Sequence, residues 1–372
     1  MKRAGIVGLG LWAPETVRRN DAWPASFSEA FRAHQKARRS GDFTVLDGRV
    51  RPYEELYQRH ATVHEADPFK GATERRVADP DAPVVAGDAE AARRALADAG
   101  VDAAQVDLVL SSALVPDRLV PNNGPAIQHL VGCVNAPGIG VESYCSAALS
   151  QLDVACALVE AGRARTVLCV QSHQIGRVND LSVPFSPMFG DASGAFVVGE
   201  VPAERGLVHT VRGGDGSLAG AVIFEYRERP GAVWWRDAAG MIRPGTEDLD
   251  GARHIGRNML AFAIDTIGAL CAESGVPIDA VAAVCMMQPL VWFQRAVADG
   301  LRIAPERVPS TYARYAHIGG AGVVANLIDA RRSGLLRDGS HVVLFAHGAG
   351  LTRYASLLRW HAPACTPDGP RA

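Results

Sequence analysis

The stretch "VESYCSAALSQLDVACALVEAG", residues 141–162, places Cys145 between a short strand-like run and a long apolar helical run. The first turn of a helix carries about half a positive elementary charge and exposes unpaired N–H groups. A thiol there ionises more readily, and its own N–H group can bind an oxyanion. Small residues follow at Ser146, Ala147 and Ala148, so a substrate can approach closely. The stretch predicts a nucleophilic cysteine, with a buried structural cysteine as the alternative.

Strands and helices alternate on both sides of this stretch, which predicts a layered α/β fold with mixed sheets. A strand is expected at 3–12, a helix at 87–102 capped by Asp88 and stopped by Gly100, and a buried strand at 106–114. The elements expected after the stretch are strands at 165–173 and 193–201, a helix at 254–275, a strand at 278–288, a helix at 321–336, and closing strands at 340–350 and 353–360. The second half repeats the rhythm of the first, which indicates an internal duplication.

Composition narrows the class of protein. The chain has 372 residues, 48% of them hydrophobic, and a formal net charge of −2. This near balance favours neither a nucleic-acid partner nor an anionic membrane surface. No apolar run in the sequence reaches the roughly 18 residues of a membrane span. The start is basic and then apolar, but it breaks at Pro14 and lacks the cleavage pattern of a signal peptide.

The seven cysteines are odd in number and include no CxxC pair. Most of them lie in apolar runs. This usage favours reduced thiols in the cytoplasm over a disulfide framework. No grouping of histidine, cysteine and aspartate has the spacing of a metal site, so we expect no metal.

Further passages carry a resemblance to a known family. They are "GATERRVADPD" (71–81), "FGDASGAFVVGE" (189–200) and "LFAHGAGLTRYASLLRW" (344–360), in that order around the cysteine stretch. With them the chain resembles the thiolase superfamily, and within it the 3-oxoacyl-ACP synthase III (ketoacyl synthase III) branch, over about residues 70–360. The resemblance implies a five-layered αβαβα fold of two similar halves, usually a homodimer. The halves would be 1–203 and 204–372, with about 20–70 as an insertion at the surface.

The resemblance also shows where this chain departs from its branch. Condensing enzymes of the branch pair the cysteine with a histidine and an asparagine. In "CMMQPLVWF" (285–293) Met287 stands at the place of the histidine, and in "ARYAHIGGAG" (313–322) His317 stands at the place of the asparagine. Relatives with a shifted histidine often carry an aspartate about five residues later, where this chain has Gly322. Which carboxylate, if any, orients His317 therefore stays open.

This difference affects which reaction the site could catalyse. Decarboxylative condensation needs two hydrogen-bond donors at the thioester carbonyl, and Met287 donates nothing. Acyl transfer to an alcohol or amine needs a base and an oxyanion hole. Cys145 and His317 would supply the nucleophile and the base, and the N–H groups of Cys145 and Ala349 the oxyanion hole.

We therefore expect an acyltransferase of natural-product biosynthesis that works by a ping-pong mechanism. Its donor would be a thioester of coenzyme A or of the phosphopantetheine of an acyl carrier protein, with no tightly bound cofactor. Its acceptor would be the hydroxyl or amine of a sugar, a cyclitol or an aglycone. Two alternatives remain: a condensing 3-oxoacyl synthase that forms a C–C bond, and a non-catalytic partner subunit. A scaffold has no need of a thiol at a helix start, which argues against the second.

Other residues are candidates with weaker signals. Arg75 and Arg76 could pair with the phosphates of the donor, or lie on a solvated surface. His347 is a rival base, although packing is the more frequent role of such a residue. The expected substrate pocket comprises Met287, Gln288, Trp292, Trp234, His347, Gly348 and Gly350. Aromatic faces suit sugars and rings, but core packing explains the tryptophans equally well.

Overall fold

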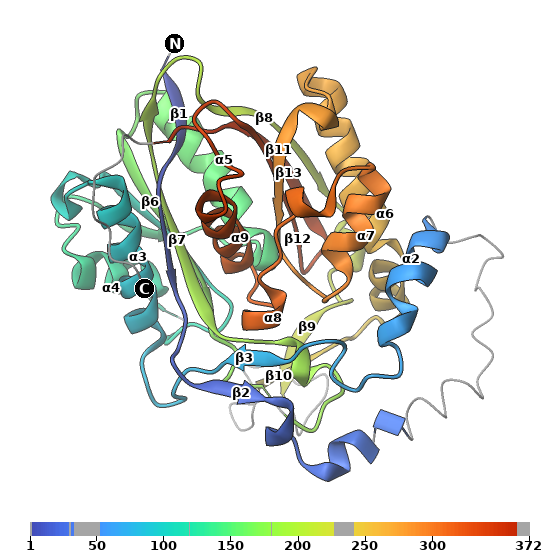
Figure 1. The fold of residues 1–372 in the computed structure, drawn as a ribbon. Coiled ribbons are helices and arrows are strands. Elements are labelled where there is room, and N and C mark those ends of the chain that lie inside the picture. The colour runs from blue at the N-terminus through green and yellow to red at the C-terminus, as the bar shows by residue number, and fades with distance from the viewer. Residues whose placement is uncertain are drawn as a thin grey trace.

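The computed structural model describes residues 2–29, 31–32, 53–118, 120–179, 181–226 and 242–362. Within them two β-sheets lie on either side of a central pair of helices, and further helices cover their outer faces (Figure 1). The inner strands at 166–173, 192–201 and 341–348 are buried along most of their length, because helices cover both faces of each sheet.

The first sheet has the order β1-β7-β6-β4-β5. β7 pairs antiparallel with both β1 and β6, and β6, β4 and β5 run parallel. The strands are β1 (Arg3–Trp12), β4 (Leu108–Ala113), β5 (Gly138–Gly140), β6 (Thr166–His173) and β7 (Ala192–Val201). The strands expected from the sequence in this half are confirmed.

The second sheet repeats this pattern with the order β8-β13-β12-β11. β13 pairs antiparallel with both β8 and β12, and β12 runs parallel to β11. The strands are β8 (Gly206–Gly214), β11 (Val281–Met286), β12 (His341–Gly348) and β13 (Thr352–Arg359). The internal duplication indicated by the sequence is therefore visible as one strand order used twice.

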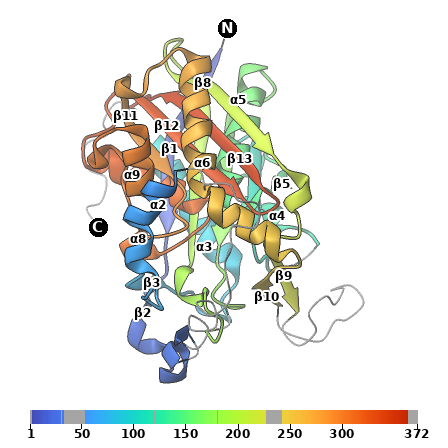
Figure 2. The ribbon, with the colours of Figure 1, turned by 90° about the vertical axis from the view of Figure 1, so that its right-hand side faces the viewer.

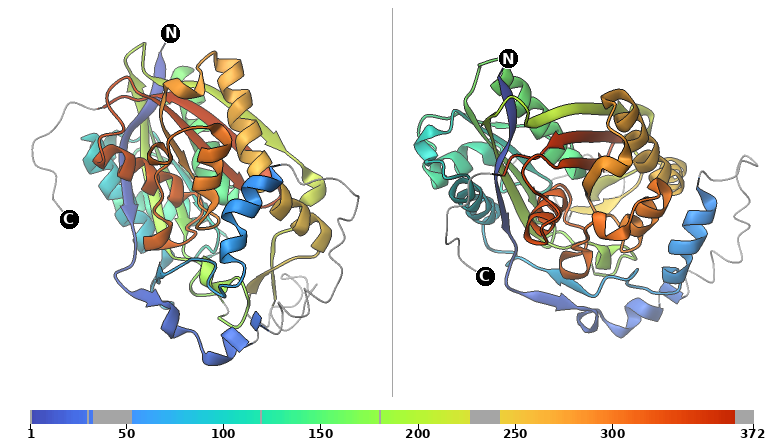
Figure 3. Two further views of the ribbon diagram at one scale, coloured as in Figure 1. Left: turned by 45° about the vertical axis from the view of Figure 1, so that its right-hand side comes forward. Right: turned by 45° about the horizontal axis from the view of Figure 1, so that its top comes forward.

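The helices complete five layers, which can be followed in the tilted right-hand view of Figure 3. α3 (Val84–Ala99) and α4 (Asn123–Val131) cover the outer face of the first sheet. α5 (Ala147–Glu160) and α9 (Ala321–Arg332) fill the space between the sheets. α6 (Leu249–Ser274) and α7 (Phe293–Leu301) cover the second sheet. This confirms the thiolase-like αβαβα architecture.

The two central helices begin close to each other. α5 leads into β6, and α9 leads into β12, so the helices hold equivalent places in the two halves. A Cβ atom on Gly320, just before α9, would lie 3.2 Å from the backbone nitrogen of Ala148 in α5. The turns that precede the two helices are thereby brought together.

Shorter elements lie around this frame. They are β2 (Val17–Arg19) paired with β3 (Glu74–Arg76), β9 (Ile223–Tyr226) paired with β10 (Ile242–Gly245), α2 (Glu54–His60) packed on α7, and α8 (Tyr312–Tyr315). The polar surface expected for 20–70 is wrong for its first part, because Trp23 and Phe27 are 6% and 4% exposed. Most of 30–52 lies outside the described residues.

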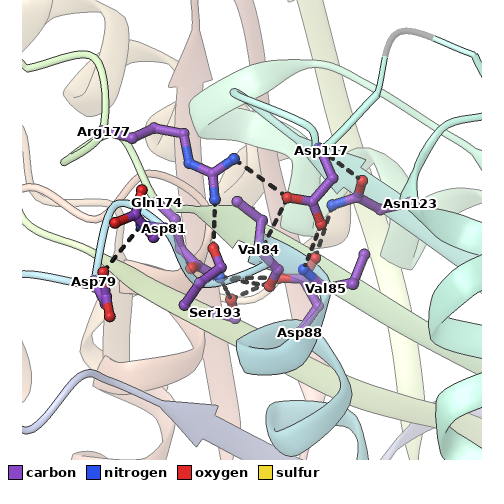
Figure 4. Close-up of polar contacts among 11 residues, drawn as sticks. Asp79, Asp81, Val84, Val85, Asp88, Asp117, Asn123, Gln174, Arg177 and Ser193 are labelled. Atoms are coloured by element: carbon purple, nitrogen blue, oxygen red, sulfur yellow. Dashed lines mark hydrogen bonds and ion pairs between the residues drawn. The ribbon is translucent and has the colours of Figure 1, made fainter.

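The start of α3 corrects one expectation (Figure 4). The helix begins at Val84, and its first N–H groups donate to the Asp117 carboxylate at 2.9 and 3.1 Å. Asp88 is therefore no cap but lies one turn inside the helix, where it is fully buried. It accepts hydrogen bonds from Asn123 Nδ2 at 3.0 Å and from Ser193 Oγ at 2.6 Å.

α6 is the one described helix that is long and apolar enough to cross a membrane by length and composition. In this fold it lies across the second sheet, as Figure 2 shows, and its apolar face packs against β8, β12 and β13. Leu260, Ile267 and Leu270 are buried in that contact. The helix therefore has a partner for its apolar side within the protein.

Candidate active site

Cys145 lies on a tight 3-10 turn, Tyr144–Ser146, between β5 and α5. Tyr144 adopts a left-handed φ of 54°, which is uncommon for a residue with a side chain. Ser146 Oγ donates to the carbonyl oxygen of Ser143 at 2.8 Å and also contacts Thr352 Oγ1 at 2.8 Å. Cys145 is thus held on a short, hydrogen-bonded turn, and the residue as a whole is partly exposed.

The glycine-rich turn between β12 and β13 packs directly on the cysteine turn. A Cβ atom at Gly348 would lie 2.2 Å from the carbonyl oxygen of Ser143 and 2.8 Å from Ser146 Oγ. Only glycine fits at such an approach. Ala349 and Gly350 follow immediately and are partly exposed, so this turn borders the thiol.

His317 lies in the turn between α8 and α9 and is 6% exposed. Its N–H group donates to the carbonyl oxygen of Met188 at 2.7 Å, and its own carbonyl oxygen accepts from the Gly190 N–H at 3.1 Å. Its Nε2 lies 3.3 Å from the sulfur of Cys145. Two residues 172 positions apart in the sequence therefore meet within hydrogen-bond distance.

The orientation of the His317 ring comes from a main-chain group. Nδ1 lies 2.9 Å from the backbone oxygen of Gln288, so Nδ1 carries the hydrogen and Nε2 keeps a lone pair. Among the described residues, no carboxylate is hydrogen-bonded to this ring. The carboxylate left open by the sequence is thus replaced by a backbone carbonyl.

The protonation states differ from the expectation drawn from the helix start. Burial raises the pKa of Cys145 to about 12, with a smaller contribution from Glu142, although its backbone N–H acts in the opposite direction. Burial lowers the pKa of His317 to about 3, with His173 as the next contribution. Loss of hydration outweighs the helix field here. At rest the pair is a neutral thiol that faces a neutral imidazole.

Met287 directly follows β11 and is 2% exposed. Its N–H donates to the carbonyl oxygen of Phe345 at 3.1 Å, and its side chain belongs to the core between the sheets. A thioether offers no hydrogen to a substrate oxygen.

Gln288 was expected to line the substrate pocket, but its side chain has another role. Its Oε1 accepts from Ser310 Oγ, Thr311 N and Tyr312 N at 2.8–3.0 Å, and its Nε2 donates to Thr311 Oγ1 at 2.5 Å. The side chain is 1% exposed and its polar atoms are used to hold the loop before α8. Its contribution to the site is the backbone oxygen that orients His317.

The aromatic candidates also fall in the core. Trp292 is 7% exposed and packs edge-on against Tyr57, with ring centroids 5.6 Å apart. His347 is 7% exposed and lies among Phe293, Phe345 and Phe262, at centroid distances of 6.0–6.5 Å. Trp292 therefore packs in the core and does not form an acceptor pocket. Trp234 lies outside the described residues.

Arg75 is not available to a phosphate. It is 1% exposed, its Nε donates to Pro187 O and its Nη2 to Ala72 O, and its guanidinium lies 4.7 Å from the ring centre of Trp23. The expected donor contact is wrong for this residue, because its donors hold neighbouring segments together. Arg76 is half-buried, and its Nη1 donates to the carbonyl oxygens of Pro14 and Glu15 at 3.3 Å.

The sequence analysis missed two groups beside the site. His173, at the end of β6, packs edge-on against the His317 ring with centroids 5.3 Å apart. Glu142 accepts hydrogen bonds from the N–H groups of Tyr144 and Ala113, and so braces the cysteine turn against the end of β4. A histidine that closes an apolar strand in "TVLCVQSH" was the available signal for the first.

Within the described ranges, no group of three or more histidine, cysteine, aspartate or glutamate side chains is placed to hold a metal ion. The six cysteines in these ranges are all free.

Comparison with known proteins gives two matching family models. Residues 140–216 match the family described as 3-oxoacyl-[acyl-carrier-protein (ACP)] synthase III, and residues 271–360 match its C-terminal counterpart. A beta-ketoacyl-[acyl-carrier-protein] synthase III from Rhodospirillum rubrum is 32% identical over 276 residues, which are 72% of this chain and 82% of that protein. One from Roseiflexus castenholzii is 32% identical over 305 residues, 78% of this chain and 88% of its own length.

Solved structures show the same fold. 3-Oxoacyl-(acyl carrier protein) synthase III from Pseudomonas aeruginosa superposes with a TM-score of 0.75 at 23% identity and covers 96% of this chain and 98% of its own. The priming beta-ketosynthase of the R1128 polyketide pathway has a TM-score of 0.74 at 25% identity and covers 97% and 98%.

Proposed function

Because the chain belongs to the 3-oxoacyl-[acyl-carrier-protein] synthase III family, we propose that it transfers an acyl group through Cys145 from a thioester to the hydroxyl or amine of a small acceptor. One observation carries the proposal. The Nε2 atom of His317 carries no hydrogen and lies 3.3 Å from the Cys145 sulfur. The hydrogen of the neutral ring is on Nδ1, which donates to the backbone oxygen of Gln288. A ring fixed in this tautomer accepts a proton at Nε2 and cannot donate one there in its neutral form.

The first half-reaction loads the enzyme. His317 Nε2 takes the Cys145 proton as the sulfur attacks the thioester carbonyl, since the thiol is neutral at rest. The N–H groups of Cys145 and Ala349 would hold the oxyanion. The intermediate collapses, the carrier thiolate leaves with the proton from His317, and the acyl group stays on sulfur. The donor would be acyl-coenzyme A or an acyl carrier protein.

The second half-reaction uses the same base. The acceptor O–H or N–H gives its proton to His317 Nε2 as its oxygen or nitrogen attacks the acyl-enzyme. The intermediate expels the Cys145 sulfur, which recovers the proton, and the ester or amide leaves. A sugar, a cyclitol or an aglycone of a natural-product pathway is the acceptor class we propose.

Condensation is the second candidate, and the relatives favour it. Those compared above are named beta-ketoacyl synthases III, and a structural neighbour is a priming beta-ketosynthase. Against it stands Met287, which occupies the place of the branch's histidine and offers no hydrogen-bond donor to stabilise an enolate. His317 could stabilise an enolate oxygen only after taking a proton at Nε2.

The two candidates differ in what the loaded enzyme does next. The enzyme is incubated with acetyl- and malonyl-thioesters of coenzyme A and of carrier protein, and the Cys145 adduct is read by intact mass and peptide mapping, with Cys145→Ala as control. The loaded enzyme is then offered either a malonyl-thioester or a panel of hydroxylated and aminated acceptors. Acyl transfer without CO₂ release supports the proposal, and a 3-oxo product with CO₂ overturns it. No adduct with any donor would favour a non-catalytic subunit.

We also propose that the protein is a homodimer that joins along β5. This strand forms one edge of the first sheet, and Ile139 on it is 45% exposed. Tyr144 and Val154 on the neighbouring turn and helix are 44% and 37% exposed. An unpaired edge beside exposed apolar side chains is a typical pairing surface. Light scattering coupled to size exclusion gives the mass directly, and Ile139→Lys should shift it to that of a monomer.

A further inference from the structure

The ring of His173 packs against the ring of the candidate base, His317. Its imidazole is 4% exposed and stands edge-on to the His317 ring, with an interplanar angle of 69° and centroids 5.3 Å apart. Phe189 lies 6.1 Å from His173 and 5.9 Å from His317, so the three rings form one cluster. The position of the His317 ring is therefore set partly by the His173 ring.

A hydrogen-bond chain through Gly190 links the same two residues. His173 Nδ1 lies 3.0 Å from the carbonyl oxygen of Gly190, and the Gly190 N–H donates to the carbonyl oxygen of His317 at 3.1 Å. A Cβ atom at Gly190 would lie 2.1 Å from the carbonyl oxygen of Tyr315, so this residue must be glycine. The side chain of His173 thus helps to fix the main chain that carries His317.

The chain after His317 is also shaped around this ring. Gly319 has a left-handed φ of 52°, and a Cβ atom there would lie 2.6 Å from His173 Cδ2. The turn into α9 can pass only because this residue has no side chain. His173 therefore lies against two residues next to His317: Gly190, which is hydrogen-bonded to its carbonyl oxygen, and Gly319, which follows it in the chain.

One atom of His173 has no evident structural use. Since Nδ1 donates to Gly190, Nε2 carries a lone pair, and among the described residues none offers it a hydrogen-bond partner. A buried polar atom without a partner calls for an explanation. Burial lowers the pKa of His173 to about 4, so the ring is neutral and adds no positive charge next to His317. A leucine or phenylalanine would fill the space without leaving a polar atom unpaired.

We propose that His173 is a positioning residue, whose ring holds the His317 imidazole in line with the sulfur of Cys145. This inference rests on the proposed function only in requiring His317 to act on Cys145, and it does not depend on the acceptor. The other titratable groups that bear on His317 are Cys145 at Nε2 and His347 from the end of β12. Neither is shown to combine a ring contact with His317 and a hydrogen bond to Gly190, whose N–H donates to the His317 carbonyl oxygen, as His173 does.

The test is the pH–rate profile of Cys145 alkylation by iodoacetamide, followed by peptide mapping in the full-length protein. His317→Ala serves as the reference for a lost base and should slow the reaction at pH 7–8 by about tenfold or more. His173→Ala and His173→Asn should fall toward that reference profile. His173→Phe keeps a ring of similar shape but loses the hydrogen bond to the Gly190 carbonyl oxygen, so it should react faster than His173→Asn and more slowly than the unmodified protein. His341→Phe, at the far end of β12 from His347, controls for the loss of any histidine.

The double variant His173→Ala/His317→Ala separates positioning from a general loss of structure. If His173 acts through His317, the double variant reacts no more slowly than His317→Ala alone. A folded His173→Asn protein with an unchanged profile, beside an altered His317→Ala profile, would overturn the inference. An unchanged His317→Ala profile would instead overturn the proposed function. Circular dichroism establishes which variants are folded, and the asparagine and phenylalanine forms decide the question if the alanine form is not.

Discussion

The turns before the two central helices hold equivalent places in the duplicated halves, yet they differ in character. Before α5, Cys145 is partly exposed on a turn held by serine hydroxyls and by the Glu142 carboxylate. Before α9, His317 is buried in a turn held by main-chain bonds to Met188 and Gly190. The duplication brings the starts of the two helices together. We call the turn before α5, which carries Cys145, the thiol end, and the turn before α9, which carries His317, the imidazole end.

This difference explains how the pair can stay neutral and still react. At the thiol end, Cys145 and the adjoining Ala349 and Gly350 are partly exposed. The imidazole end is dry, so its ring has a low proton affinity until a charge develops beside it. Changes at the two ends should therefore have different consequences, and the largest are expected at the buried end.

Replacement of His317 by alanine should have the largest effect on turnover. Acyl transfer should fall by about 10²- to 10⁴-fold, because no other base lies within hydrogen-bond distance of the Cys145 sulfur among the described residues. Loading at high pH should persist, since hydroxide can generate the thiolate. Single-turnover transfer from the isolated acyl-enzyme measures this. Transfer at the unmodified rate would contradict the assignment of His317 as the base.

Cys145 and His317 could be predicted from the sequence, whereas the groups that orient them could not. The helix start marked Cys145, and the family resemblance placed His317 at a position of the same site. The backbone oxygen of Gln288 has no sequence signal, because any residue supplies a carbonyl. The role expected for Arg75 was wrong for a physical reason. In the sequence, an arginine that stacks on Trp23 and donates to carbonyl oxygens looks the same as a solvent-exposed arginine. The strands were predictable because apolar runs covered on both faces leave a clear pattern.

The outer helices of the two halves also differ in how their first turns are capped. α6 is capped by its own Asp248, whereas α3 borrows Asp117 and buries Asp88. Burial raises the pKa of Asp88 from 3.8 to about 6, so the folded state holds this proton more tightly than the unfolded state. Stability from this group is therefore present below about pH 4 and is lost as pH rises to about 6. The loss is on the order of 3 kcal/mol.

Asp88→Asn tests this assignment by denaturant unfolding between pH 4 and 7.5. The variant is expected to be less stable than the unmodified protein at pH 4, because Asn123 Nδ2 and Ser193 Oγ both donate to this side chain. The deficit should shrink as pH rises, since only the unmodified protein loses stability there. Asp191, whose pKa burial also raises to about 6, cancels in this difference. A deficit that does not change with pH would contradict the assignment.

The contact between the glycine-rich turn and the thiol turn can be broken at Gly348. A methyl group there meets the rigid carbonyl of Ser143 at 2.2 Å. Gly348→Ala should cost about 1–3 kcal/mol of stability and slow acyl loading. Gly350→Ala is the matched control, because it has open space and only an unfavourable φ of 73°, worth about 1 kcal/mol. Thermal unfolding and loading rates of the two variants separate a steric clash from backbone strain. Equal effects would mean that the turn is free to move.

Met287→His is the smallest expected change and the sharpest probe of the two candidate chemistries. The backbone bond from Met287 N to Phe345 O should survive, and a histidine at this place could donate to a substrate oxygen. One donor of an oxyanion site is worth about 10²- to 10³-fold, and an unsupported ring should recover only part of that. We expect CO₂ release from a malonyl-thioester to rise about tenfold above the unmodified protein. A protein that already releases CO₂ rapidly with methionine in place would show that the missing donor is supplied elsewhere, and would move the proposal to condensation.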